Sequence, residues 1–329
     1  MNRYDVYGIG HALVDTEVKV SDDFLAAAGL TKGTMTLIDD ARHAELLRML
    51  SGFSRHRSCG GSSANTLIGT AQLGGRCFHS SRIANDENGA FFARDMKTNG
   101  VDNDLETRQG AGTTGQCLVL ITPDAERTMC THLGVSESFS IQDLAPDRLA
   151  GASWLYVEGY LVSSPSARQA ALEAVRLARR HGVKIALTFS DVSMIEFFRA
   201  GLDEIMGTGV DLLFCNQAEA LKYANTDRLE EAKAVLASRS VSFGVTLGAR
   251  GALIYTDHQE YAIPGVQVQA VDANGAGDLF AGALLYGLTH GFATERAGKL
   301  ACRAAALLVT RHGARLSRDQ TLNVLNNLD

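Results

Sequence analysis

One stretch of the chain places an acidic residue directly after a turn of small residues. The stretch runs from Val271 to Leu288, VDANGAGDLFAGALLYGL, and its second half repeats apolar residues at helical spacing. Gly275, Ala276 and Gly277 let backbone N–H groups converge at the start of that helix, where the helix dipole also favours an anion. Asp278 follows in the first turn, placed to take a proton from a hydroxyl that attacks a bound phosphoryl group. The stretch predicts an anion hole with a general base beside it.

A plain structural interpretation of this stretch also exists. Short glycine motifs recur by chance, and an acidic residue in a first helical turn complements the helix dipole. A second stretch at residues 59–75, CGGSSANTLIGTAQLGG, helps to choose between the functional and the structural interpretation. Gly61 permits close backbone approach, Ser62 or Ser63 can cap the helix, and Asn65 lies in its first turn. An amide there can donate to and accept from a polyhydroxy ligand, although asparagine in a first turn is also a common structural feature.

Composition limits the class of protein. The 329 residues are 46% hydrophobic and 21% charged, as expected for a soluble globular chain with one large domain and an appendage. A net charge of −6 gives no electrostatic reason to expect nucleic acid or an anionic membrane as a partner. Asp5 interrupts the region where a signal peptide needs an apolar run, and no apolar stretch approaches the roughly 18 residues of a membrane span. We therefore expect a cytoplasmic protein, either a monomer or a homodimer that pairs through exposed sheet edges.

The cysteines and the first glycines exclude two other kinds of site. Six cysteines are scattered without a C-x-x-C pair, which predicts buried free thiols and no zinc site. Gly8 and Gly10 follow a short strand, but Leu13 occupies the third position of a G-x-G-x-x-G motif. A nicotinamide-dependent oxidoreductase is therefore a remote alternative.

The elements that must position these residues form two groups. Alternation at Val18 and Val20, and at Met35 and Leu37, predicts half-exposed strands, and Thr113 to Leu133 predicts a hairpin around a Pro-Asp turn. We expect these segments, about 13–38 and 108–135, to form a small β-sheet lid. The remainder, 1–12, 39–107 and 136–329, forms the core of one domain spanning residues 1–329.

From residue 152 onward, strands alternate with amphipathic helices. We expect strands at 154–157, 183–189, 212–215, 243–247, 253–255 and 266–270, and a capping box of Ser193 with Glu196. This alternation predicts an α/β fold with a mainly parallel sheet covered by helices on both faces. Ligands of such sheets bind at the carboxyl ends of the strands, where the candidate residues fall.

The order and spacing of four motifs resemble the ribokinase-like (PfkB) family of carbohydrate and nucleoside kinases. The motifs are GG-x-x-x-N at 60–65, NQAE at 216–219, TLGARG at 246–251 and DANGAGD at 272–278, and they extend along almost the whole chain. Within that family, three other segments look most like adenosine kinases and close nucleoside or sugar kinases: GHALVDTEVKVSDDFLAAAGL, ERTM-x-x-x-LG at 126–134, and LTFSDVSMIEFFRAGLDEIM followed by VDLLFCNQAEA. The resemblance implies a ribokinase-like core closed by a β-sheet lid. It also implies an ATP-dependent kinase of a primary hydroxyl, with a ribonucleoside, adenosine first, as acceptor.

The resemblance also implies roles for single residues. Asp278 matches the general base, and Gly275, Ala276 and Gly277 match the anion hole. Asp15, Gly61 and Asn65 match positions that hold sugar hydroxyls, and Thr246, Gly248 and Gly251 border the ATP site. Asn216 and Glu219 match the motif that organises Mg²⁺ and phosphate, with Glu219 acting through water.

Two positions depart from the family pattern. Ala273 replaces the usual threonine, which leaves open the local nucleotide contacts and a monovalent cation such as K⁺. His11 stands in the acceptor site where adenosine kinases usually carry asparagine, which leaves nucleoside specificity open. Tyr160 or Leu161 is a candidate wall against a base or sugar. The alternatives are therefore a sugar kinase for ribose or a hexose derivative, and a catalytically silent ligand-binding relative.

Overall fold

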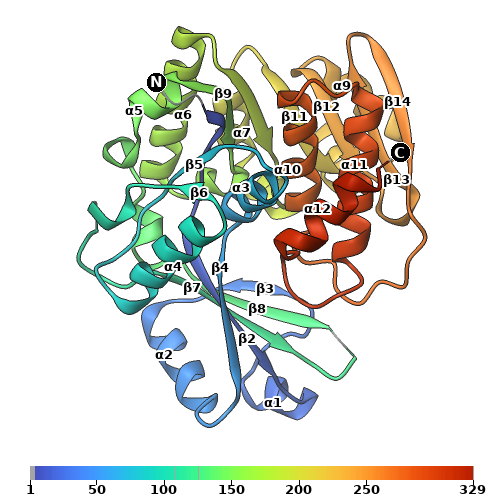
Figure 1. Ribbon diagram of the computed structural model, residues 1–329. Helices are drawn as coiled ribbons and strands as arrows, with labels where there is room; N and C mark the ends of the chain where they lie inside the picture. Colours follow the sequence, from blue (N-terminus) through green and yellow to red (C-terminus); the bar gives the residue numbers. More distant parts are fainter. Residues whose placement is uncertain (1–3, 108, 125, 329) are drawn as a thin grey trace.

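The computed structural model describes residues 4–107, 109–124 and 126–328, so the expected lid boundary at residue 108 lies outside the described residues. Within them the chain forms a large sheet covered by helices and a smaller sheet below it in Figure 1. No helix in these ranges combines the length and apolarity needed to cross a membrane. All six cysteines are buried and free, as expected from their spacing.

The large sheet contains nine strands among the described residues, in the order β14-β13-β12-β11-β10-β9-β1-β5-β6. All neighbours from β12 to β6 pair in parallel, whereas β13 and β14 run antiparallel at one edge. The predicted mainly parallel sheet is therefore confirmed. The strands are β1 (Tyr4–Ile9), β5 (Cys77–Ser80), β6 (Val101–Asp102), β9 (Ala152–Val157), β10 (Lys184–Thr188), β11 (Val210–Asn216), β12 (Ser240–Thr246), β13 (Gly251–Thr256) and β14 (Gln259–Pro264).

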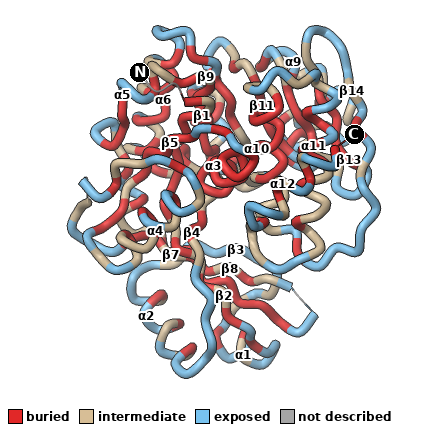
Figure 2. Tube along the Cα trace, viewed as in Figure 1, coloured by how far each residue is buried: buried red, intermediate tan, exposed pale blue. Residues whose placement is uncertain are grey.

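Helices bury both faces of the large sheet, which explains the near-continuous apolar character of its strands. One face packs against α3 (Ser62–Gln72), α4 (Glu87–Thr98), α10 (Ala276–Thr289), α11 (Thr294–Leu308) and α12 (Arg318–Asn326). The other packs against α5 (Pro146–Ala150), α6 (Pro165–His181), α7 (Val192–Met206), α8 (Gln217–Ala224) and α9 (Leu229–Ala237). Figure 2 shows that α3 and α10 are buried along most of their length, at the centre of the molecule.

The smaller sheet has the order β3-β8-β7-β2-β4. Its strands are β2 (Leu13–Lys19), β3 (Met35–Leu37), β4 (Arg55–Gly60), β7 (Gly115–Ile121) and β8 (Arg127–His132), and its outer face packs against α1 (Asp22–Ala27) and α2 (Asp40–Met49). The expected hairpin is β7 and β8, which pair antiparallel. β4 is a strand of this sheet and α2 packs against it. We had expected both segments, within residues 39–107, to lie in the core. Their charged sequences gave no sign that β4 pairs with β2.

Three local expectations are wrong. Residues 266–270 form no strand; Val266 and Val268 alternate with glutamines but are 41% exposed, because no neighbouring strand pairs with them. α7 is capped by Asp191, whose carboxylate accepts from Ser193 N, and not by Ser193 with Glu196. The N-cap of α3 is Gly61, which has no side chain to cap the helix, so neither Ser62 nor Ser63 is its cap.

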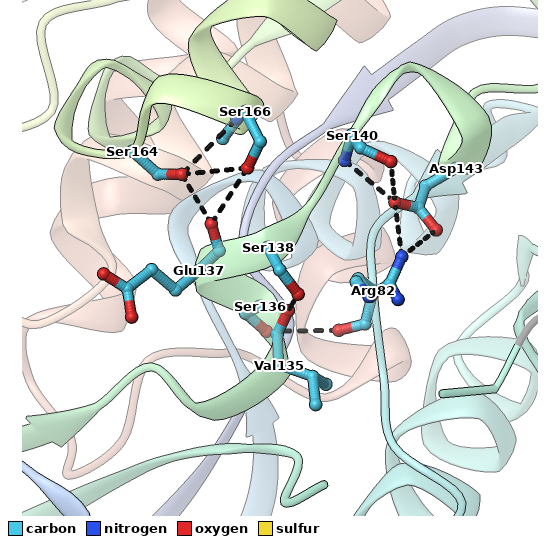
Figure 3. Close-up of polar contacts among 10 residues, drawn as sticks. Arg82, Val135, Ser136, Glu137, Ser138, Ser140, Asp143, Ser164 and Ser166 are labelled. Atoms are coloured by element: carbon cyan, nitrogen blue, oxygen red, sulfur yellow. Dashed lines mark hydrogen bonds and ion pairs between the residues drawn. The ribbon is translucent and has the colours of Figure 1, made fainter. Parts of the chain in front are cut away.

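Hydrogen bonds anchor the segments that join the two sheets. The chain passes between the sheets at residues 10–12, 61, 113–114 and 133. Figure 3 shows the segment that follows β8, where the Ser136 hydroxyl contacts the backbone oxygen of Arg82, 3.1 Å away. The same hydroxyl donates to Ala12 O at 2.7 Å. The Arg82 guanidinium in turn pairs with Asp143 at 3.2 Å. These contacts link the passage after β8 to the passage after β1, which holds the smaller sheet over the carboxyl ends of the large-sheet strands.

Candidate active site

A cavity of about 670 Å³ lies between the carboxyl ends of the large-sheet strands and the inner face of the smaller sheet. Its volume is in the range of small-molecule sites. Most of the residues that the sequence predicted for the site line it: His11, Asp15, Gly61, Asn65, Asn216, Glu219, Thr246, Gly248, Gly275, Gly277 and Asp278. Ala276 and Gly251 are absent from the lining, although Ala276 begins α10 between two lining glycines and Gly251 begins β13.

At the predicted anion hole, Gly275 takes a conformation that other residues rarely adopt. Gly275 is the N-cap of α10 with φ +72°, and a Cβ there would lie 2.3 Å from the carbonyl oxygen of Ala314. Leu279 N donates to Gly275 O at 2.8 Å, which starts the helix at once. Gly275 and Gly277 line the cavity at this helix N-terminus, where unpaired N–H groups and the helix dipole favour an anion. Ala276 N, in contrast, donates to Ala273 O at 3.2 Å.

Asp278 is held by two donors from α3. Its Oδ1 accepts from Ser62 Oγ at 2.6 Å and its Oδ2 accepts from Asn65 Nδ2 at 3.1 Å. Burial raises the pKa of Asp278 to about 6, and the hydrogen bonds from Ser62 and Asn65 oppose that rise. The carboxylate remains partly accessible from the cavity. It is thus ionised near neutral pH, oriented, and able to accept a proton from a hydroxyl group.

The hydrogen bond from Ser62 to Asp278 is a contact that the sequence did not predict. The sequence assigned it only as a possible helix cap, whereas its hydroxyl points across to α10. Ser62 and Asp278 are 216 residues apart. No local pattern could pair them.

Asp15 supplies a second carboxylate from the smaller sheet on the other side of the cavity. It lies on β2, where Leu13 and Asp15 face the cavity while Val14 is fully buried. Burial raises the pKa of Asp15 to about 7, and the guanidinium of Arg315 opposes that rise. The structure shows no side-chain hydrogen bond to this carboxylate among the described residues, so both oxygens are free to accept from a ligand.

A buried glutamate, Glu158, is the other residue that the sequence did not reveal. It follows β9 and is 1% exposed. Its Oε2 accepts from Ser63 N at 2.8 Å and its Oε1 accepts from His11 N at 3.3 Å. The sequence carried one signal, a charged residue at the carboxyl end of the buried strand ASWLYV, and that signal pointed only to the neighbouring Tyr160 and Leu161.

Asn216 and Glu219 form a capping box at the start of α8. Glu219 N donates to Asn216 Oδ1 at 2.8 Å, and Asn216 N donates back to Glu219 Oε2 at 3.0 Å. Burial raises the pKa of Glu219 to about 7, with the backbone hydrogen bond from Asn216 opposing it. A cation nearby would stabilise this buried carboxylate. In the described part of the chain, no group of three or more His, Cys, Asp or Glu side chains is arranged to hold a metal. This donor set fits a Mg²⁺ held mainly by phosphates and water.

The inner face of the smaller sheet supplies an apolar wall. Met35, Leu37, Val119 and Met129 line the cavity from β3, β7 and β8. Met35 and Leu37 are 37% and 54% exposed, so their apolar surface is accessible to a ligand in the cavity. On the opposite side Tyr160 lines the cavity.

Of the two candidates for the second wall, Leu161 does not reach the cavity. It is fully buried in the core beneath it. Ala273, where the family usually has threonine, lies in the cavity lining and carries no hydroxyl.

Comparison with known proteins identifies the family. The pfkB family carbohydrate kinase model matches residues 25–321. The aminoimidazole riboside kinase of Salmonella typhimurium is 30% identical over 240 residues, which cover 70% of this chain and 74% of that protein. Two solved structures match over 100% of both chains: a probable sugar kinase protein from Rhizobium etli CFN 42 (TM-score 0.91, 35% identity) and adenosine kinase from Sinorhizobium meliloti (0.90, 34%). The chain therefore belongs to the pfkB family of carbohydrate kinases, phosphotransferases with hydroxyl acceptors that include kinases of both sugars and nucleosides.

Proposed function

We propose that this protein transfers the γ-phosphate of ATP to the primary hydroxyl of a ribonucleoside, with adenosine as the first candidate. The observation that carries the proposal is the position of Asp278. Its carboxylate lies in the first turn of α10, beside the anion hole, and two donors from α3 orient it toward the same cavity that Asp15 lines. A base, an anion hole and a second carboxylate around one cavity suit phosphoryl transfer to a polyhydroxy acceptor.

The acceptor end of the cavity offers several groups that accept hydrogen bonds. The Asp15 carboxylate has free oxygens, and Asn65 Oδ1 is buried without a hydrogen-bond partner within the described residues while its Nδ2 donates to Asp278. A cis-diol such as ribose O2′ and O3′ supplies donors to both side chains, with the carboxylate accepting from two hydroxyls in a fork. The primary hydroxyl of the same sugar would then be oriented toward Asp278.

The apolar wall favours a nucleoside over a free sugar. A planar base would cover Met35 and Leu37 and would lie across the cavity from Tyr160. Covering these side chains removes exposed apolar area from water, at about 25 cal/mol for each Å². A free sugar lacks the flat apolar surface needed for this contact. The similarity to the Sinorhizobium meliloti adenosine kinase also supports a nucleoside.

The end of the cavity near Asn216 and Gly248 is more open to solvent than the acceptor end near Asp15. Asn216, Gly248 and Gly277 are exposed there, and Thr246 lies at the carboxyl end of β12. We assign this end to ATP, with Gly275 and Gly277 facing the transferring phosphoryl group. A Mg²⁺ ion bound to the phosphates would neutralise their charge, with Glu219 reaching it through water. A monovalent cation near Ala273 remains part of the proposal.

In this mechanism the chain moves one proton. Asp278 accepts the proton of the primary hydroxyl while the hydroxyl oxygen attacks the γ-phosphorus of ATP. The bond between that phosphorus and the oxygen that bridges it to the β-phosphate breaks, and ADP leaves. The first-turn N–H groups of α10 stabilise the charge on the phosphoryl oxygens. The smaller sheet excludes water, which would otherwise compete as the acceptor.

The test is ADP release from ATP with a panel of adenosine, inosine, guanosine, ribose and fructose. We expect the highest kcat/KM with a ribonucleoside. We also expect 2′-deoxy and 3′-deoxyadenosine to be much poorer acceptors, and Asp15→Ala to remove most of that difference, because a site built to bind a hydroxyl penalises its absence. Equal kcat/KM for ribo and deoxy acceptors would refute the diol site.

A sugar kinase is the second candidate, favoured by the match to the Rhizobium etli probable sugar kinase protein. Strong activity on a free sugar with none on nucleosides would establish it. Binding of a nucleoside or sugar without any ADP release would instead indicate a catalytically silent relative.

A further inference from the structure

Arg315 joins a segment of the core to a strand of the smaller sheet, next to the proposed acceptor site. It lies between α11 and α12, and its side chain is 13% exposed. Its Nη1 donates to Asp95 Oδ2 on α4 at 3.1 Å, and its Nη2 donates to Cys59 O on β4. Asp95 Oδ2 also accepts from Cys59 N at 3.0 Å. Both backbone polar groups of Cys59 are therefore held by this one ion pair.

The Asp15 carboxylate rests on the residue that follows Cys59. Asp15 lies on β2, which pairs antiparallel with β4. A Cβ on Gly60 would lie 2.2 Å from Asp15 Oδ1 and 2.4 Å from Oδ2, so the carboxylate packs directly on the glycine backbone. Arg315 therefore grips the part of β4 that supports this carboxylate.

The charge of Arg315 also acts on Asp15. Burial raises the pKa of Asp15 to about 7, and Arg315 opposes that rise more than any other charged group. Because this value lies near neutral pH, a positive charge beside the carboxylate decides how much of it is ionised. The other charged and titratable groups that face Asp15 are Glu17 on β2 and Asp278 on α10, which raise its pKa, Arg127 on β8, which lowers it, and Cys117 on β7.

We propose that Arg315 is a positioning residue for the acceptor: it holds the strand under the Asp15 carboxylate and keeps that carboxylate ionised, so that it accepts hydrogen bonds from two neighbouring hydroxyls. Arg315 itself lies outside the cavity lining and acts through Asp15. The inference rests on the proposed function and deepens it. An ionised carboxylate accepts at both oxygens, whereas a protonated one donates at one of them, so the charge selects an acceptor that carries a vicinal diol.

The chain offers a matched control for the loss of a partly buried arginine. Arg82 pairs with Asp143 at 3.2 Å, and the two side chains are 28% and 6% exposed. Neither residue lines the cavity. Arg82→Met therefore reports the general cost of losing an arginine–aspartate pair, without a change of charge at Asp15.

The binding test compares Arg315→Met with Arg82→Met by calorimetry at pH 6 and pH 9, on either side of the pKa of Asp15. The ligand is adenosine, or ribose if the acceptor panel identifies a sugar. Loss of the guanidinium should raise the pKa of Asp15 by about 1, the lower end of the effect of an adjacent opposite charge. At pH 6 the Kd of Arg315→Met should then exceed that of wild type about 10-fold, because less of the carboxylate is ionised. At pH 9 Asp15 is ionised in both proteins, and the Kd values should agree within about 3-fold.

A conservative variant separates the charge from the shape of the side chain. Arg315→Lys keeps the charge and should bind the acceptor at pH 6 within about 3-fold of wild type. In Arg315→Met, kcat and the KM of ATP at pH 9 should also stay within about 3-fold of wild type. An equal rise in Kd at both pH values would show that Arg315 only supports the fold. A pH-dependent rise of the same size in Arg82→Met would likewise overturn the assignment.

A second measurement needs no acceptor. ¹³C NMR of protein labelled at the aspartate carboxyl carbons, with the Asp15 signal identified by its loss in Asp15→Asn, should show a titration midpoint near pH 7 in wild type. The midpoint should rise in Arg315→Met. It should fall in Asp95→Asn, which keeps an acceptor for Cys59 N but removes the carboxylate that offsets the guanidinium charge. An unmoved midpoint in either folded variant would contradict the inference, so the test holds even if one variant does not fold.

The two failures are distinguishable. If no compound in the panel yields ADP, the proposed function fails, while the titration of Asp15 still reports on Arg315. If the wild type is active and Arg315→Met binds the acceptor as wild type does at pH 6, only the inference about Arg315 fails.

Discussion

Arg127 of the smaller sheet and Asp272 of the loop before α10 form an ion pair at 2.5 Å. The two residues are 145 positions apart in the chain, and their side chains are 9% and 2% exposed. Arg127 also pairs with Glu17 on β2 at 3.2 Å, and Asp272 accepts from Asn274 N and Gly313 N. The pair therefore connects the smaller sheet directly to the segment that we propose as the anion hole.

Replacing Arg127 should destabilise the protein because two carboxylates lose their partner. Breaking a buried pair by removing one member costs about 3 to 5 kcal/mol. We expect Arg127→Met to lower the free energy of unfolding by that amount, measured by urea denaturation. The matched control is Arg228→Ala, whose ion pair with Glu231 is exposed and should contribute about 1 kcal/mol or less. A loss in Arg127→Met no larger than in the control would show that the link carries little stability.

Asp278→Asn should abolish turnover while sparing binding. The amide keeps the shape of the carboxylate but cannot accept the proton, and general-base assistance typically contributes about 100- to 10,000-fold. We expect kcat to fall by that factor, with the dissociation constants of ATP and acceptor nearly unchanged by calorimetry. Asp227→Asn, at an exposed position, is the control. More than about a tenth of the wild-type kcat in Asp278→Asn would exclude a base role.

The pH dependence of the rate should follow Asp278. Since the pKa of Asp278 is raised to about 6, the active carboxylate form is lost as the pH falls through that value, and kcat/KM should fall with it. Ser62→Ala removes a hydrogen bond that favours the charged form and should move the acidic limb to higher pH. Ser63→Ala changes a neighbouring hydroxyl that has no hydrogen-bond partner within the described residues, and should leave the limb in place. A Ser62→Ala profile that superimposes on wild type would contradict the assignment.

Stability should also depend on pH through Asp15. Its pKa is about 7 in the folded protein and 3.8 without burial, so between these values the folded state holds a proton that the unfolded state has released. The contribution of Asp15 to stability is therefore present below about pH 4 and is lost as the pH rises through about 7. We expect Asp15→Asn to raise Tm relative to wild type more at pH 8 than at pH 5, measured by calorimetry without ligands. The same Tm difference at both pH values would rule out this titration.

Glu219→Gln should weaken the use of magnesium more than the binding of the acceptor. A neutral side chain no longer attracts hydrated Mg²⁺, whereas the acceptor contacts assigned to Asp15 and Asn65 lie elsewhere in the cavity. We expect the Mg²⁺ concentration for half-maximal rate to rise several-fold with little change in acceptor KM. Because the substitution also alters a capping box, Gln320→Ala in the remote capping box of α12 is the control for a lost cap. An unchanged magnesium titration would leave Glu219 with a capping role alone.

Features that depend on neighbours in the chain could be predicted from the sequence. The start of α10 after Gly275 and the place of Asp278 in its first turn depend only on the local sequence. The strand alternation after residue 152 gave the parallel sheet and placed Asn216 and Thr246 at strand ends. By contrast, the alternation at residues 266–270 misled because a lone extended segment without a pairing partner shows the same pattern.

Contacts between distant segments were decided only by the tertiary structure. The sequence by itself determined the chemistry at each strand end, because residue type and backbone conformation are local properties. The packing of α3 against α10 brought Ser62 and Asn65 to Asp278, and the joining of β1, β9 and α3 brought His11 and Ser63 to Glu158. The pairing of β4 with β2 likewise followed from the assembled smaller sheet. Such contacts depend on how whole elements bury their apolar faces, and that burial is a property of the assembled fold.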